Sequence, residues 1–167
     1  MQPLPIHRFP DPCLKRAARP VLRVEEETRR FIDALIRTMR HHPRCVGLAA
    51  PQVGRDLRIA VMDASAHSKA AANHGLLVLV NPSLQLGGAS LVQREGCLSL
   101  PDFTANVRRA TRVRLRAWDR GGAPYECALE GFEAIVAQHE VDHLDGRLFL
   151  DRVTSVTTDV FTRKRYG

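Results

Sequence analysis

The spacing of apolar residues changes along this chain, from a helical period to a strand period and back again. From Glu25 to His41, apolar residues recur three and four positions apart, which predicts an amphipathic helix. Between residues 58 and 129 the apolar runs are short or alternate with charged residues, which predicts strands. A second helix is expected from Gly131 to Leu144, stopped by Gly146. Strands followed by a late helix, without βαβ alternation, predict an α+β fold.

The expected architecture places small mixed or antiparallel sheets around the second helix, with the amphipathic helix on the N-terminal side. The last segment, Thr157 to Tyr166, is expected to form a short basic C-terminal helix. Residues 1–23, rich in proline and arginine, are expected to wrap around the surface, and residues 64–75 to form a loop. The expected strands are Arg58–Met62, Leu76–Val80, Ser90–Gln93, Arg112–Trp118 and Tyr125–Leu129.

Length and charge limit the classes of protein to consider. A chain of 167 residues predicts a single domain, residues 1–167. Its 25 basic and 18 acidic residues give a formal charge of +7, but the arginines are scattered, so a DNA-binding module is not expected. No apolar run approaches the roughly 18–20 residues of a membrane span, and the N-terminus lacks a signal-peptide pattern. A cytoplasmic protein is expected, with its four isolated cysteines as free thiols.

The strongest chemical motif is His139-Glu140-Val141-Asp142-His143 on the second helix. Residues four apart share one helical face, so both imidazoles can reach a single metal ion. Glu140 lies about 100° further around the helix, where its carboxylate can reach a water molecule at the metal. Unpaired histidines would be costly to bury among apolar residues. The motif therefore predicts a metal site.

A catalytic metal site usually has three protein ligands and one open position, so a third ligand is needed. Asp145 and Asp151 are downstream carboxylates without special spacing. Cys97 follows a predicted strand, but cysteine is also among the most buried residue types. Spacing alone leaves a metal ligand and a buried structural cysteine both open.

Three separated motifs resemble those of peptide deformylases, enzymes that remove the formyl group from the N-terminal methionine of new polypeptides. They occur in the family's order, and the resemblance extends from about Asp11 to Asp151. The motifs are Gly47-Leu48-Ala49-Ala50-Pro51-Gln52, Glu95-Gly96-Cys97-Leu98-Ser99 and Gln138-His139-Glu140-Val141-Asp142-His143-Leu144-Asp145-Gly146.

The resemblance implies a ligand set of Cys97, His139 and His143 around one divalent metal, naturally Fe(II), with zinc or nickel also able to bind. Water would fill the fourth position, and Glu140 would take its proton. The oxyanion that forms on the substrate would be stabilised by the metal, the Gln52 side-chain amide and the Leu98 backbone N–H.

The resemblance also implies how the substrate binds. A nascent N-formyl-methionyl polypeptide would lie extended beside Val46, Gly47 and Gly96, with backbone hydrogen bonds. Its methionine would enter an apolar pocket lined by Phe132, Ile135 and Val136. The helical pattern by itself predicts core packing for these three residues equally well. The protein is expected to be monomeric, and Arg163-Lys164-Arg165 suggests weak ribosome association.

The sequence departs from the family pattern at Cys45, at residues 102–105 and in its tail, which ends soon after Asp151, and other functions compete. Cys45 stands where the first motif usually opens with glycine, which would strain a backbone with positive φ. Asp102-Phe103-Thr104-Ala105 replaces a segment in which some members place an arginine near the substrate. The alternative functions are a zinc peptidase built on the same HExxH helix, and a non-catalytic RNA-binding domain with a structural metal.

Overall fold

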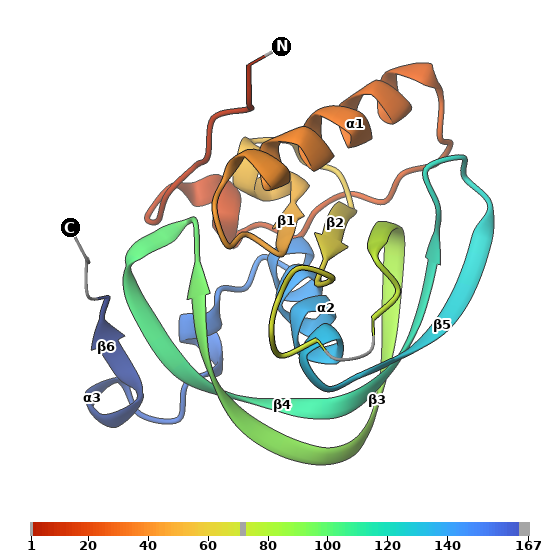
Figure 1. Cartoon of the computed structure of the whole chain (residues 1–167). Helices are drawn as coiled ribbons and strands as arrows, with labels where there is room; N and C mark the ends of the chain where they lie inside the picture. The colour runs from red at the N-terminus through yellow and green to blue at the C-terminus, as the bar shows by residue number, and fades with distance from the viewer. Residues whose placement is uncertain (1, 71–72, 164–167) are drawn as a thin grey trace.

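The computed structural model describes residues 2–70 and 73–163, and it confirms the α+β class. The described strands form one six-stranded, wholly antiparallel sheet in the order β1-β2-β3-β4-β5, and β6 pairs with β4. A single sheet thus replaces the several small ones expected (Figure 1). The bounds are α1 Glu26–His41, β1 Gly47–Ala49, β2 Ile59–Asp63, β3 Leu76–Cys97, β4 Leu100–Trp118, β5 Pro124–Glu130, α2 Gly131–Leu144, α3 Val156–Asp159 and β6 Val160–Thr162, with short 3-10 helices at Pro12–Lys15, Ala50–Val53 and Phe149–Arg152.

Strands β3 and β4 are far longer than their sequence patterns predicted. Leu76–Val80 and Ser90–Gln93 belong to one continuous strand, and Arg112–Trp118 is only the second half of β4. Residues 81–82 and 88–89, which lie between the two expected strands, coincide with shifts in the β3–β4 register. Such bulges bend a strand without ending it, and Figure 1 shows the pair curving around α2.

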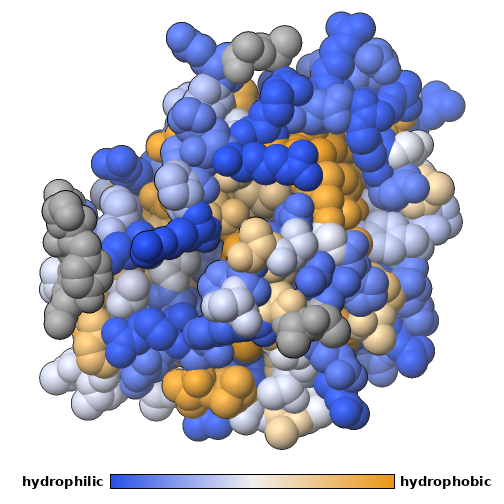
Figure 2. Space-filling view, in the orientation of Figure 1, coloured by the Kyte–Doolittle hydropathy of each residue, from blue (hydrophilic) through white to orange (hydrophobic). Residues whose placement is uncertain are grey.

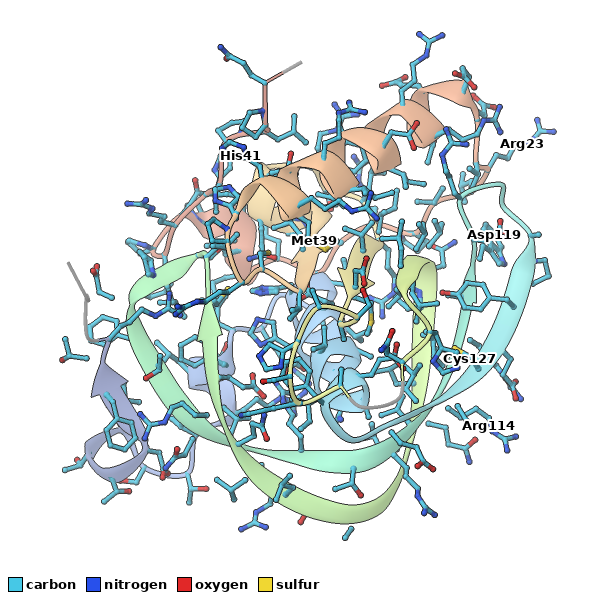
Figure 3. All side chains as sticks on the ribbon, viewed as in Figure 1. Arg23, Met39, His41, Arg114, Asp119 and Cys127 are labelled. Carbon is cyan, nitrogen blue, oxygen red and sulfur yellow. The ribbon has the colours of Figure 1, made fainter. Side chains whose placement is uncertain are left out.

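Helix α2 lies inside this curve and is buried around most of its circumference. Its apolar residues form a core with β2, β4 and β5. Helix α1 packs on the other side of β1 and β2 through Ile32, Leu35 and Met39, and Met39 points from α1 toward the sheet (Figure 3). The C-terminal stop of α2 at Gly146 has φ 71°, the left-handed conformation that glycine tolerates best.

The N-terminal segment supports two of the sequence motifs, and Leu14 anchors it in the core without exposure. The His7 N–H donates to the Gln52 carbonyl at 2.8 Å, and the Phe9 N–H donates to the Ser99 carbonyl at 2.9 Å. Residues before α1 therefore help to fix the backbone of the first two motifs, at Gln52 and at Ser99.

The prediction of a C-terminal helix from Thr157 to Tyr166 was wrong over most of its described length. Helix α3 has only four residues, and the chain then forms β6 against residues Phe103–Ala105 of β4. A strand forms here because Val160, Phe161 and Thr162 are β-branched or aromatic and the edge of β4 is available. Tyr166 lies outside the described residues. Within residues 2–70 and 73–163, no helix combines the length and apolar character needed to cross a bilayer.

Candidate metal centre and substrate cleft

The three predicted metal ligands converge where the end of β3 meets α2. The Cys97 Sγ lies 3.3 Å from the His143 Nε2, which lies 3.2 Å from the His139 Nε2. Ligand atoms bound to a tetrahedral zinc-sized ion are about 3.3–3.6 Å apart. One sulfur and two imidazole nitrogens are also a donor set suited to divalent transition metals. The residues therefore fit a single divalent metal ion.

The charges at these side chains favour the binding of a cation. Burial opposes ionisation of Cys97, but His143 and His139 hold the pKa of its thiol well below the usual value. Burial likewise opposes protonation of His139, yet the hydrogen bonds that its ring donates to Cys97 and Glu95 raise its pKa well above the usual value. Cys97 is thus a thiolate beside a protonated His139, and a metal ion can replace the proton of this histidine.

A carboxylate that the sequence analysis assigned no role orients His139. The Glu95 Oε2 lies 2.8 Å from the His139 Nδ1, and the pKa of Glu95 is lowered to about 2 because its hydrogen bonds to Arg109 and His139 outweigh burial. The charged carboxylate therefore accepts a hydrogen bond from the Nδ1–H, which leaves Nε2 to face the other two ligands. Metal-binding histidines are commonly held in this way.

Glu95 is itself held by a buried ion-pair chain that sequence reasoning also missed. The Arg109 guanidinium donates to Glu95 at 2.7 and 3.0 Å and to Asp142 at 2.6 Å. Asp142 also accepts hydrogen bonds from Arg152. Arg109 is 4% exposed, so removing any partner would leave a buried charge uncompensated.

Glu140 faces the same space as the three ligands and is available for proton transfer. Its side chain is buried, its Oε2 has no hydrogen-bond partner among the described residues, and burial raises its pKa to about 7. Gly47 makes room for it, because a Cβ at that position would overlap the Glu140 carboxylate. A carboxyl group with this pKa can both accept and return a proton near neutral pH.

Gln52 is 2% exposed, and its amide is held with the donor end toward the ligands. Its Oε1 accepts from the Ala49 N–H at 3.0 Å, and its Nε2 lies 3.3 Å from the Cys97 Sγ and 3.2 Å from the Ser99 Oγ. Leu98 follows Cys97 and lines the same cleft. Both predicted oxyanion donors are therefore brought beside the metal ligands.

These groups open into a cleft of about 710 Å³ lined by all six predicted substrate-binding residues. Phe132 and Val136 also pack against the core, whereas Ile135 is 4% exposed and belongs to none of the core clusters among the described residues. Of the three, Ile135 therefore favours a position in the cleft wall most clearly. The six residues that were predicted to bind the substrate are Val46, Gly47, Gly96, Phe132, Ile135 and Val136.

Strand β1 borders the cleft as an edge strand of the sheet, paired on one side with β2. An edge strand can accept an extended peptide through main-chain hydrogen bonds. Cys45, just before β1, does not have positive φ, and its Sγ lies 3.1 Å from the Gly47 carbonyl. Cysteine at this position is therefore free of the backbone strain considered from the sequence.

Comparison with known proteins identifies the family of this chain. The model of the polypeptide deformylase family matches residues 3–159. The chain belongs to the polypeptide deformylase family. The peptide deformylase of Syntrophobacter fumaroxidans is 40% identical over 161 residues, which are 96% of this chain and 92% of that protein.

Solved peptide deformylases share the fold. The crystal structure from Thermotoga maritima has a TM-score of 0.84 and 36% identity, covering 93% of this chain and 100% of that one. The Met-Ala-Ser-bound class I type b deformylase from Acinetobacter baumannii has a TM-score of 0.84 and 32% identity, covering 91% of this chain and 99% of that one.

Membership in the deformylase family decides among the functions considered from the sequence. The chain is a hydrolase of a metal-dependent family whose reaction is removal of the formyl group from formyl-methionyl polypeptides. The comparisons favour this activity over a zinc peptidase or a non-catalytic RNA-binding domain.

Proposed function

We propose that this chain deformylates nascent N-formyl-methionyl polypeptides, with Cys97, His139 and His143 holding one divalent metal and Glu140 carrying the proton. The observation that supports this assignment most strongly is the unpartnered Glu140 Oε2, buried beside three converging ligand atoms. A site with only a structural role would need no buried, unpaired carboxylate, which is costly to keep.

The metal supplies Lewis-acid polarisation of the formyl carbonyl and makes water more acidic. We propose Fe(II) as the native ion, with zinc or nickel as replacements in purified protein, because a thiolate and two imidazoles suit all three. Glu95 fixes the tautomer of His139, so that Nε2 carries the free lone pair. Arg109 in turn keeps Glu95 ionised and in place.

Glu140 moves the proton in both halves of the reaction. With a pKa of about 7, its carboxylate takes a proton from the attacking water, and its carboxylic acid then gives that proton to the departing amine nitrogen. The products are formate and a free methionine amine. Gly47 allows the close approach of this carboxylate to the substrate strand.

Negative charge develops on the formyl oxygen during attack, and two donors are placed to stabilise it. The Gln52 Nε2 is aimed toward the ligands because its amide oxygen is held by Ala49. The Leu98 backbone N–H follows the metal-binding cysteine. Each well-placed donor of this kind is worth about 3–4 kcal/mol of transition-state stabilisation.

The substrate is proposed to lie extended along the edge of β1, between Val46-Gly47 and Gly96. Its methionine side chain then packs against Phe132, Ile135 and Val136. The apolar character of these three residues and the low exposure of Ile135 support a pocket for an unbranched apolar side chain. Phe132 is fixed on its other side by stacking on His67, with ring centroids 4.1 Å apart.

We further propose that residues 1–167 act as one domain and as a monomer in the cytoplasm, where nascent chains are made. Weak ribosome association is assigned to Arg163-Lys164-Arg165, of which Lys164 and Arg165 lie outside the described residues. The net charge of +7 supports this contact. Co-sedimentation with ribosomes should be lost when the last ten residues are removed, and its survival would exclude the tail.

Mass spectrometry of a formyl-Met-Ala-Ser peptide tests the proposed reaction. Metal-loaded protein prepared without oxygen should remove the formyl group alone and leave every internal peptide bond intact. Glu140→Gln should abolish the reaction while retaining the metal, and exposed Glu27→Gln should behave as the parent protein. Internal cleavage would support the peptidase instead, and an untouched peptide with bound metal would support a structural metal.

A further inference from the structure

Four basic side chains surround the mouth of the substrate cleft. Arg44 precedes β1, Lys69 lies in the segment between β2 and β3, Arg94 is on β3, and Arg163 follows β6. The first three are exposed and Arg163 is half-buried. Figure 2 shows hydrophilic side chains over most of this face, around a hollow with apolar walls below α1. The four residues form what we call the basic rim.

The basic rim has no acidic partners among the residues that the structure describes. Within residues 2–70 and 73–163, arginines elsewhere, such as Arg58 and Arg120, form ion pairs with carboxylates, whereas none of the four rim residues does. Among the described residues that line the cleft, the only acids are Glu95 and Glu140, and both are buried. Glu95 is already paired with Arg109. The positive charge at the mouth is therefore not neutralised locally.

Strand β6 carries Arg163 to the substrate side of the cleft. Its pairing with β4 and the hydrogen bond from the Arg163 N–H to the Asp102 carbonyl at 2.8 Å fix the backbone at this point. The guanidinium then lies over Gly96, where a Cβ would clash with it. Gly96 is one of the residues along which the substrate is proposed to run.

Arg94 on β3 contacts β6 as well. Its guanidinium stacks 3.5 Å from the ring centroid of Phe161, in the middle of β6, and donates to the Asn106 side chain at 3.0 Å. This contact is a cation–π interaction. Two rim charges are thus held beside β6, while Arg44 and Lys69 come from the segment before β1 and the segment between β2 and β3.

We propose that the basic rim makes this enzyme prefer formyl-methionyl polypeptides with acidic side chains at the positions after methionine. This inference rests on the proposed function, since it requires the formyl group at Glu140 and the methionine against Ile135. An extended chain advances about 3.3 Å per residue, so the residues that follow methionine leave the cleft past Gly96 and Arg163. Aspartate or glutamate there meets up to four unpaired cations.

The preference should act on binding rather than on the chemical step. The rim lies outside the group of residues that contact the formyl carbon, so its attraction lowers KM and leaves kcat nearly unchanged. Exposed ion pairs change an equilibrium by roughly 2- to 5-fold each. They weaken as salt shortens the Debye length from about 30 Å at 0.01 M to about 3 Å at 1 M.

Three amidated peptides of equal length test the preference: formyl-Met-Ala-Asp-Glu, formyl-Met-Ala-Asn-Gln and formyl-Met-Ala-Lys-Lys. At low salt the acidic peptide should have a KM about 5- to 10-fold below that of the neutral one, and the basic peptide should have the highest KM. In 0.5 M salt the three values should converge to within about 2-fold. Equal KM values at low salt, or the lowest KM for the basic peptide, would overturn the proposal.

Substitutions test whether the basic rim causes the KM preference for acidic peptides. Arg163→Gln and Lys69→Gln should each reduce the KM ratio between neutral and acidic peptides by roughly 2- to 5-fold, and Arg163→Lys should restore most of it. Arg23→Gln is the matched control, because Arg23 is also exposed but lies beside the start of α1, across the molecule from β6 (Figure 3). An unchanged ratio in both rim variants would refute the assignment.

Direct binding separates this proposal from the proposed function. If no formyl peptide is hydrolysed, the deformylase assignment fails, and calorimetry with the unformylated Met-Ala-Asp-Glu and Met-Ala-Asn-Gln amides still tests the rim. Tighter binding of the acidic peptide, lost in Arg163→Gln, supports the rim by itself. If polyuridylate binds at the rim and no preference for the acidic peptide can be measured, the rim is an RNA contact and the proposal is wrong.

Discussion

Substitution of Gly47 by alanine should disable catalysis without removing the metal. A Cβ at position 47 would lie 2.7 Å from the Glu140 Cδ and 2.9 Å from its Cγ, whereas ordinary van der Waals contact begins at 3.4 Å. The Glu140 carboxyl carbon must therefore retreat by about 0.7 Å, and its nearer oxygen by more. Misplacement of a reacting group by about 1 Å can cost about 100-fold in rate.

We expect kcat of Gly47→Ala to fall by about 10- to 100-fold, which is about 1.4–2.7 kcal/mol of transition-state stabilisation. The assay is formate release from formyl-Met-Ala-Ser, with metal content and melting temperature measured on the same preparation. The metal content should stay at one ion per chain, because the three atoms nearest to the added Cβ all belong to Glu140 and not to a metal ligand.

Gly87→Ala is the matched control for this substitution. Gly87 also lies in a strand, its φ is not positive, and a Cβ there would meet nothing within 4 Å. This variant should keep its kcat within about 2-fold of the parent. A Gly47→Ala protein that retains full kcat with an unchanged melting temperature would refute the claim that this glycine makes room for Glu140.

Three further predictions concern the groups around the metal. Because Glu140 must be ionised to accept a proton and burial raises its pKa to about 7, kcat/KM should fall tenfold per pH unit below about pH 7; a profile that is flat to pH 5 would contradict this role. Glu95→Gln should weaken metal binding by about 10- to 100-fold in competition with a chelator, whereas Glu27→Gln should not. Purification in air should lose activity through oxidation of Fe(II) and the Cys97 sulfur, and nickel should restore it; equal activity of aerobic and anaerobic iron-loaded preparations would count against this.

The metal-binding helix could be predicted because its information is local. His139 and His143 are four residues apart on one helix, so their shared face follows from helical geometry alone. Cys97 is different, since spacing left it open and only the family resemblance pointed to it. The structure brings its Sγ to the imidazoles by ending β3 beside α2, a contact between distant segments.

Arg109 shows which signal the sequence analysis overlooked. Its alternation was recognised only from Arg112 onward, where the arginines face water. Extended backward in the same phase, the pattern places Arg109 on the inward face with Val107 and Val113, and all three are buried. An arginine on an inward face predicts a buried partner, here Glu95 and Asp142.

The C-terminal strand could not be predicted from its own residues. Three residues are too few to show an alternating pattern, and a strand this short forms only against an existing partner. Its partner, the first half of β4, was itself not predicted, because residues 100–111 were not recognised as a strand. The location of Arg163 beside Gly96 therefore follows from pairing across some 60 positions of sequence, between Phe103 and Thr162.

Metal titration of the metal-free protein tests the central claim most directly, with formate release from formyl-Met-Ala-Ser followed at each addition under anaerobic conditions. The account predicts that activity rises linearly with Fe(II) or nickel and stops at one equivalent per chain. Glu140→Gln should bind the same single equivalent and release no formate, and Cys97→Ala should show no such break. Activity that is independent of added metal, or a Cys97→Ala protein that titrates like the parent, would contradict the account.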